Sequence, residues 1–328
     1  MERRADIDQA KGLAILLVVF GHIVARADPL GVGWYEPLRR AVYAFHMPFF
    51  LYLSGLVVAL SGAAQLPQAA WRGFAVQRAK RLLLPFLAMG MLSIFGKMAA
   101  ERLMFVDHVP AGLAAGLDGL FWHTANSPNG SVWYLWVLFL FSIAAPVLWA
   151  ACGGWVWVLA VGLYFVPLPP LFYADHVARY ALFFAAGILA GMQWPHWTAL
   201  IDRHWRWLLG IFALGFVSIV LFGKDWPVAV TLLPMGLVSM PALHGLVRYS
   251  RPYWCHIFQW LGRYCFMIYL FNTISIGLAK GLLLHVSDWD GVHFVPFAIV
   301  LMLSGCLLPV GLKVFVLRRV KGLDRATD

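Results

Sequence analysis

The chain has 328 residues, of which 62% are hydrophobic and only 12% are charged. A soluble globular domain usually carries about 25% charged residues, so this composition excludes an ordinary water-soluble domain and indicates a membrane protein. The net charge of +10 would suggest nucleic-acid binding in a soluble protein. In a membrane protein, basic cytoplasmic loops explain such a charge, so we expect no nucleic-acid partner.

Ten apolar runs follow one another along the chain, and each is read as a spanning helix, which needs roughly 20 apolar residues. Only short loops separate them, the longest covering about 101–131. We therefore predict an all-α fold, a polytopic membrane bundle of about ten transmembrane helices in one domain, residues 1–328. The runs lie near 12–27, 41–60, 82–100, 132–151, 154–171, 178–194, 207–223, 227–247, 260–284 and 293–317.

The start of the chain shows a basic segment, an apolar run and the triplet Ala25-Arg26-Ala27, a pattern similar to a secretory signal peptide. Asp6 and Asp8 dilute the positive start, and His22 interrupts the apolar run. We therefore expect this segment to be retained as the first span.

Basic residues are divided unequally between the two sides that ten spans define. With the N-terminus inside, 16 of the 25 basic residues fall in cytoplasmic segments and seven fall outside. Lys and Arg accumulate in cytoplasmic loops. We therefore predict that both termini are cytoplasmic.

Lys11 and His22 lie eleven positions apart in the first span. At the rise of an α-helix this is about 17 Å, which places Lys11 at the cytoplasmic mouth and His22 well inside the hydrocarbon core. An ionisable group buried in a span is a candidate functional residue. The alternative is that His22 only hydrogen-bonds a neighbouring helix.

His46 opens the second span within Phe45-His46-Met47-Pro48. Because the first two spans are antiparallel neighbours joined by a short outer loop, we expect His22 and His46 to approach one another. Ser54-Gly55, further along, offers a small polar patch for close helix packing. Alternatively, His46 is an interfacial residue at the headgroup level.

Arg78 and Arg81 precede the third span and, three positions apart, share one helix face. Guanidinium groups suit phosphates, and Lys11 lies at the same membrane level. Alternatively, the arginines are membrane anchors or lipid-headgroup contacts.

Three further residues give weaker signals. Trp133 and Tyr134 begin the fourth span, where an aromatic belt is expected in any case. Asn272 is an amide within the ninth span and could serve only as an interhelical contact. The four cysteines form no C-x-x-C pair, so we predict no metal site.

Together these segments resemble the acyltransferase 3 family, integral-membrane enzymes that O-acylate bacterial surface carbohydrates. The family usually has Arg where this chain has Lys11, and the variant is similar to the fucose 4-O-acetylase-like branch. Lys keeps the charge but loses the bidentate fork. The ninth span often carries His where this chain has Asn272, so proton transfer there is not expected. The resemblance rests on residues 8–22, 45–48, Ser54-Gly55, 78–81, Trp133-Tyr134-Leu135 and 268–272.

The resemblance implies an acyltransferase of the bacterial inner membrane, surrounded by membrane lipids, with acyl-CoA (commonly acetyl-CoA) as co-substrate and no permanently bound cofactor. The acceptor would be a hydroxyl of a cell-surface or lipid-linked carbohydrate. His22 would act as general base or carry the acyl group itself, with His46 assisting. Lys11, Arg78 and Arg81 would bind the CoA phosphates, and the expected substrate contacts are Ser54, Trp133, Tyr134 and Asn272.

Two other classes remain open. A transporter or exporter of a lipid-linked sugar or polysaccharide precursor would also have buried polar residues and ten spans, although no two-half repeat is visible. A non-catalytic membrane partner of a polysaccharide synthase would use its histidines only to hold helices together.

Overall fold

The computed structural model describes residues 4–24, 31–102, 109–250 and 252–319. Some residues used above lie outside these ranges. They include the Ala25-Arg26-Ala27 triplet and five basic residues of the orientation argument, namely Arg3, Arg26, Arg251, Lys321 and Arg325.

The described residues form α-helices, short 3-10 turns and an isolated bridge between His123 and Leu171, so the all-α prediction is confirmed. The helices are α1 (Ala5–His22), α2 (Tyr35–Tyr43), α3 (His46–Leu60), α4 (Gln68–Ala100), α5 (Leu113–Phe121), α6 (Trp133–Cys152), α7 (Val156–Tyr164), α8 (Ala174–Met192), α9 (Trp194–Phe222), α10 (Val228–Arg248), α11 (Pro252–Arg263), α12 (Cys265–Leu283) and α13 (Phe294–Phe315).

Seven stretches of the described chain are long and apolar enough to cross a membrane, which identifies a multi-pass membrane protein. The prediction of a polytopic bundle is thereby confirmed. The predicted runs 132–151 and 154–171 fall together in one of these stretches, and the first and sixth predicted runs correspond to α1 and α8. The seven stretches are Tyr35–Leu60, Gln68–Ala100, Trp133–Tyr164, Trp194–Asp225, Val228–Arg248, Cys265–Leu283 and Phe294–Arg319.

Helix α7 is much shorter than its predicted run at 154–171. It has nine residues, which gives about 14 Å of helix. The helix ends at Tyr164, shortly before Pro167, Pro169 and Pro170, and three prolines within four residues strongly disfavour a helix because each lacks the amide N–H.

Three described helices were not predicted. α5 falls in a segment interpreted as a loop. α2 covers the predicted outer loop and the start of the run 41–60, and α11 overlaps the start of the run 260–284 and is separated from α12 by Tyr264. Each has at most twelve residues, too few to span the hydrocarbon core.

The coordinates divide into two compact units. Unit 1 comprises residues 1–53 and 193–328, and unit 2 comprises residues 54–192, so the boundary falls inside α3. The single domain over 1–328 stays a prediction.

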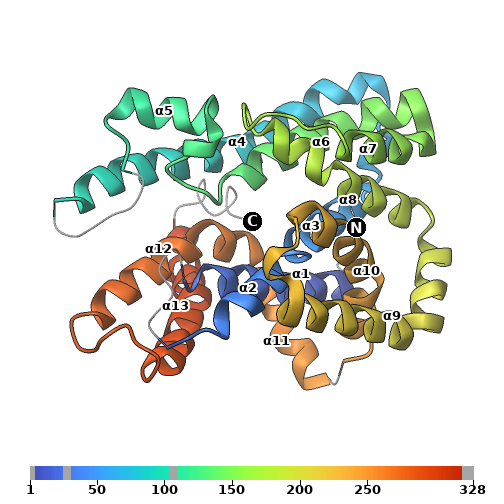
Figure 1. Ribbon diagram of the computed structural model, residues 1–328. Helices are drawn as coiled ribbons and strands as arrows, with labels where there is room; N and C mark the ends of the chain where they lie inside the picture. The colour runs from blue at the N-terminus through green and yellow to red at the C-terminus, as the bar shows by residue number, and fades with distance from the viewer. Residues whose placement is uncertain (1–3, 25–30, 103–108, 251, 320–328) are drawn as a thin grey trace. The chain divides into compact units, whose positions relative to one another are not determined.

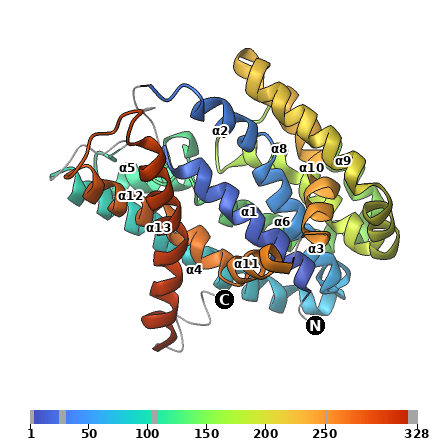
Figure 2. The same ribbon diagram turned by 90° about the horizontal axis from the view of Figure 1, so that it is seen from below.

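In unit 1, α1 packs against α2, α10, α11, α12 and α13. Figure 2 shows it in dark blue beside the orange α11. α9 with α10, and α12 with α13, form helical hairpins (Figure 1). Small and branched side chains of α1, such as Ala10, Ala14 and Val19, are fully buried against these neighbours. α1 is therefore a central helix of its unit.

In unit 2, α4 packs against α5 and α6, while α8 packs against α6 and α7. Gly55 of α3 lies so close to the backbone of Phe184 on α8 that a Cβ atom would collide with it. Gly191 meets the side chain of Ala59 in the same way. The small residue after Ser54 thus allows two helix backbones to approach, as small residues do in membrane bundles.

Candidate active site

His22 ends α1 and is held by Asn272 of α12. Its Nδ1 atom lies 2.6 Å from Oδ1 of Asn272. The amide nitrogen of Asn272 donates to the carbonyls of Ile268 at 2.9 Å and Tyr269 at 2.8 Å, so the amide oxygen must be the atom that faces the imidazole. His22 therefore donates its Nδ1–H, and the lone pair lies on Nε2.

The two partners differ in exposure. Asn272 is 0% exposed, whereas His22 retains partial exposure. A neutral imidazole with one oriented N–H and a lone pair on its other nitrogen has what a general base requires. The burial of Asn272 favours a role in orienting His22 over the substrate contact predicted from the sequence.

Helix α2 holds the end of α1 that carries His22. The Tyr35 hydroxyl donates to the Phe20 carbonyl at 2.6 Å, and Nη1 of Arg39 donates to the Val24 carbonyl at 2.9 Å. Glu36 accepts a hydrogen bond from Nε of Arg39 at 2.7 Å. Carbonyls at a helix C-terminus lack a hydrogen-bond donor within the helix. Tyr35 and Arg39, four positions apart on α2, supply the missing donors for α1.

Tyr43, one further turn along α2, contacts the residue before His22 and the ring of His46. Its hydroxyl donates to the carbonyl of Gly21 at 2.8 Å, next to His22. Its ring stacks on the imidazole of His46 with a centroid distance of 4.9 Å. Nδ1 of His46 donates to the Val42 carbonyl at 3.0 Å, which leaves Nε2 of this ring as an acceptor. Tyr43 thus links the two histidines.

The segment around Lys11 is fixed by close contact between α1 and α11. A Cβ atom on Gly12 would collide with the backbone of Phe258, and one on Gly262 would collide with the backbone of Asp8. One glycine on each helix therefore allows the backbones of α1 and α11 to lie this close together. Because α1 is unbroken from Ala5 to His22, Lys11 and His22 lie about 17 Å apart along it.

Unit 2 contains the remaining predicted residues of the second and fourth spans. The Ser54 hydroxyl lies 2.8 Å from that of Tyr134, so one donates to the other. Trp133 is partly exposed, and its ring stacks on Tyr180 at 4.9 Å. Two hydroxyls and an indole face thus come from neighbouring positions.

Arg78 and Arg81 both lie on α4. Arg78 is partly exposed, with its guanidinium 5.0 Å from the ring centroid of Phe74, and Arg81 is exposed. Both belong to unit 2, whereas Lys11 and His22 belong to unit 1, so the shared phosphate site stays a prediction.

Sequence reasoning missed the residues that hold His22 and His46. Tyr35, Arg39 and Tyr43 recur every four positions, but Tyr35 and Arg39 lie in a segment interpreted as a loop and Tyr43 lies in the predicted second run. A helix-period pattern of donors next to a spanning helix was the signal that could have revealed them.

Comparison with known proteins adds an independent finding. The chain matches the acyltransferase domain of the acyltransferase 3 family over residues 4–311. It is 25% identical to Nodulation protein NolL of Mesorhizobium japonicum over 228 residues, covering 68% of this chain and 57% of that protein. It is 28% identical to Nodulation protein NolL of Sinorhizobium fredii over 229 residues, covering 68% and 58%.

The alignments thus cover less than two thirds of either NolL protein. No solved structure matches the chain significantly. The family match, however, includes every candidate site residue named from the sequence and nearly the whole chain. The chain belongs to the acyltransferase 3 family.

Proposed function

We propose that this protein moves an acyl group, in the simplest case acetyl, from acyl-CoA to a hydroxyl of a cell-surface or lipid-linked carbohydrate. The family match supports acyl transfer within a membrane. The hydrogen bond between His22 and Asn272 carries the assignment of the base, because it leaves Nε2 of a partly exposed imidazole as an acceptor.

In the proposed reaction, Nε2 of His22 takes the proton of the acceptor hydroxyl while its oxygen attacks the thioester carbonyl carbon. A C–O bond forms, and collapse of the tetrahedral adduct breaks the C–S bond. The proton on His22 then passes to the departing CoA thiolate, so no net proton is consumed. General-base catalysis of this kind contributes roughly 10²–10⁴-fold in rate.

The remaining residues are assigned by their chemistry. Lys11, Arg78 and Arg81 bind the CoA phosphates on the cytoplasmic side of a bacterial inner membrane. His46 assists His22 or orients the acceptor, and Tyr43 supports this pairing. The acceptor contacts are the hydroxyl pair of Ser54 and Tyr134 and the indole face of Trp133.

The test measures transfer from radiolabelled acetyl-CoA in membranes carrying His22→Ala. We expect activity to fall by about 10²-fold or more. His285→Ala is the matched control, because His285 is an exposed histidine that donates to the Gly281 carbonyl outside the site. Its turnover should equal that of the wild type.

The acceptor is identified separately, by comparing O-acyl groups on the cell-surface glycans of cells with and without the protein. Normal turnover by the His22→Ala variant would remove the base assignment. Wild-type membranes that release no CoA and acylate no glycan would overturn the proposed function as a whole.

A further inference from the structure

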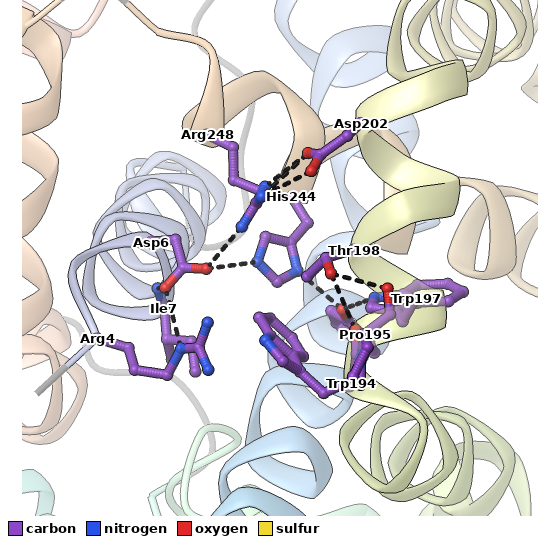
Figure 3. A network of polar contacts seen from close by, with 11 residues as sticks. Arg4, Asp6, Ile7, Trp194, Pro195, Trp197, Thr198, Asp202, His244 and Arg248 are labelled. Carbon is purple, nitrogen blue, oxygen red and sulfur yellow. Dashed lines mark hydrogen bonds and ion pairs between the residues drawn. The ribbon is translucent and has the colours of Figure 1, made fainter. Parts of the chain in front are cut away.

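A chain of polar contacts surrounds Asp6 in the first turn of α1 (Figure 3), and His22 is the last residue of the same helix. Nε1 of Trp197 on α9 donates to the Tyr52 oxygen at 2.7 Å, and that oxygen lies 2.8 Å from Nδ1 of His244 on α10. An indole N–H only donates, so Tyr52 accepts from Trp197. The buried Tyr52 O–H then needs an acceptor of its own, and Nδ1 of His244 lies within hydrogen-bond distance of it. Nδ1 of His244 is therefore an acceptor.

The tautomer of His244 follows from this order. A neutral imidazole that accepts at Nδ1 carries its proton on Nε2. Nε2 is buried, lacks a hydrogen-bond partner within the described part of the chain, and faces Oδ2 of Asp6 at 3.7 Å. The same oxygen accepts a hydrogen bond from Nη1 of Arg248 at 3.2 Å. We call these four side chains, Asp6, Tyr52, His244 and Arg248, the Asp6–His244 clamp.

The clamp retains a charged carboxylate. Burial raises the pKa of Asp6, but interactions with His244, Arg4 and Arg248 outweigh it and lower the pKa to about 2. Arg4 lies 3.6 Å from Asp6, with its guanidinium 4.2 Å from the ring centroid of Trp194. Asp6 is therefore ionised at neutral pH.

The order carboxylate, imidazole, hydroxyl is also the order of a hydrolytic triad. Here, however, Tyr52 and His244 are both 0% exposed. No substrate can reach the Tyr52 hydroxyl, and its oxygen already accepts from Trp197. The arrangement therefore holds elements in place and does not perform chemistry.

We propose that the Asp6–His244 clamp is a positioning device for the acyl donor: it fixes the first turn of α1 against α3 and α10 and thereby sets the place of Lys11. This rests on the proposed function. Lys11 follows Asp6 by five positions, about 7.5 Å along the same helix. His22 is about 24 Å from Asp6 and is held separately by Asn272.

This separation predicts which kinetic constant depends on the clamp. In Asp6→Asn the side chain keeps its size but loses the charge that pairs with Arg248 and Arg4. We expect the KM for acetyl-CoA to rise on the order of fivefold, while kcat stays within about twofold. Asp6→Glu restores the charge at greater length and should give an intermediate KM.

Asp202→Asn is the matched control. Asp202 also pairs with Arg248, at 3.0 Å, but it lies on α9 and its side chain is 39% exposed. An exposed ion pair contributes little, so the KM for acetyl-CoA should stay near that of the wild type.

A second pair of variants keeps the test decisive if Asp6→Asn does not fold. Tyr52→Phe and His244→Gln leave the ion pair between Asp6 and Arg248 intact and should raise the same KM by a smaller factor. An unchanged KM in the folded variants, or a fall in kcat alone, would overturn the inference. Absence of wild-type turnover would overturn the proposed function, and the donor role of the clamp with it.

Discussion

Nδ1 of His22 on α1 and Oδ1 of Asn272 on α12 lie 2.6 Å apart, although 250 positions separate the two residues in the chain. The Asn272 amide is fixed by its bonds to two carbonyls of its own helix. The asparagine therefore acts on His22 as the orienting group acts on the histidine of a hydrolytic triad, selecting one tautomer without exchanging a proton itself.

The first prediction concerns Asn272→Ala. Without the amide oxygen, the imidazole can rotate and adopt the wrong tautomer, so kcat should fall by about 10–10²-fold. Acetyl-transfer assays on membranes check this. Asn126→Ala, at an exposed position that ends a short 3-10 helix, is the control and should leave kcat unchanged. Equal kcat values for the Asn272→Ala and wild-type proteins would contradict the orienting role.

The second prediction separates the hydroxyl of Tyr43 from its ring. Tyr43→Phe loses the bond to Gly21 but keeps the stack on His46, whereas Tyr43→Ala loses both. We expect a loss of activity of several-fold in the first variant and at least about tenfold in the second. Steady-state kinetics on both variants decide, and identical values would show that the stack has no role.

Much of the fold could be predicted because the length of an apolar run is a local property. The long helices of the structure overlap predicted runs, although α4 begins at Gln68 and α9 at Trp194, well before the runs at 82–100 and 207–223. The short helices α2, α5 and α11 could not be predicted by the same rule, since they are too short to give a spanning signal.

Less of the candidate site could be predicted. His22 and His46 were found because an ionisable residue in a span is costly. His244 also lies within a predicted run, 227–247, so the same rule would have marked it as a candidate, but it was not named from the sequence. The pairing of His22 with Asn272 depends on which helices are neighbours, and the spacing of residues within one helix carries no such information.

The third prediction concerns the contact that places Lys11. Gly12→Ala and Gly262→Ala should each lower the free energy of unfolding by about 1–3 kcal/mol, because the added Cβ atom meets the backbone of the facing helix. Gly277→Ala on α12 is the control, since nothing lies within 4 Å of the added atom. Thermal unfolding in detergent measures all three, and equal stability would contradict the close contact.

The fourth prediction concerns donor binding by α4. Arg78→Ala and Arg81→Ala should each raise the KM for acetyl-CoA by about tenfold, and lysine at either position should recover only part of the loss because its ammonium cannot form a bidentate contact. Arg72→Ala, an exposed position on the same helix, is the control. An unchanged KM in both arginine variants would remove the phosphate-binding assignment.

The last prediction concerns the orientation of the protein in the membrane, because the proposed function places the acyl donor and the acceptor on opposite sides of the bilayer. Single cysteines are introduced at Gln65, after α3, and at Val286, which is 80% exposed after α12, in a variant with its four cysteines replaced by alanine. With the predicted topology, a membrane-impermeant maleimide labels Val286→Cys in intact spheroplasts. Gln65→Cys should react only after permeabilisation.

The two positions together also test α7. They lie on opposite sides if an odd number of the predicted spans between them cross the membrane, as all seven are predicted to do, and α7, with nine residues, is the shortest of these helices. Labelling of neither position in intact spheroplasts would show that an odd number of these spans fails to cross, with α7 the first candidate. Labelling of Gln65→Cys alone would show that the protein has the opposite orientation in the membrane. Lys11 would then face away from cytoplasmic acyl-CoA.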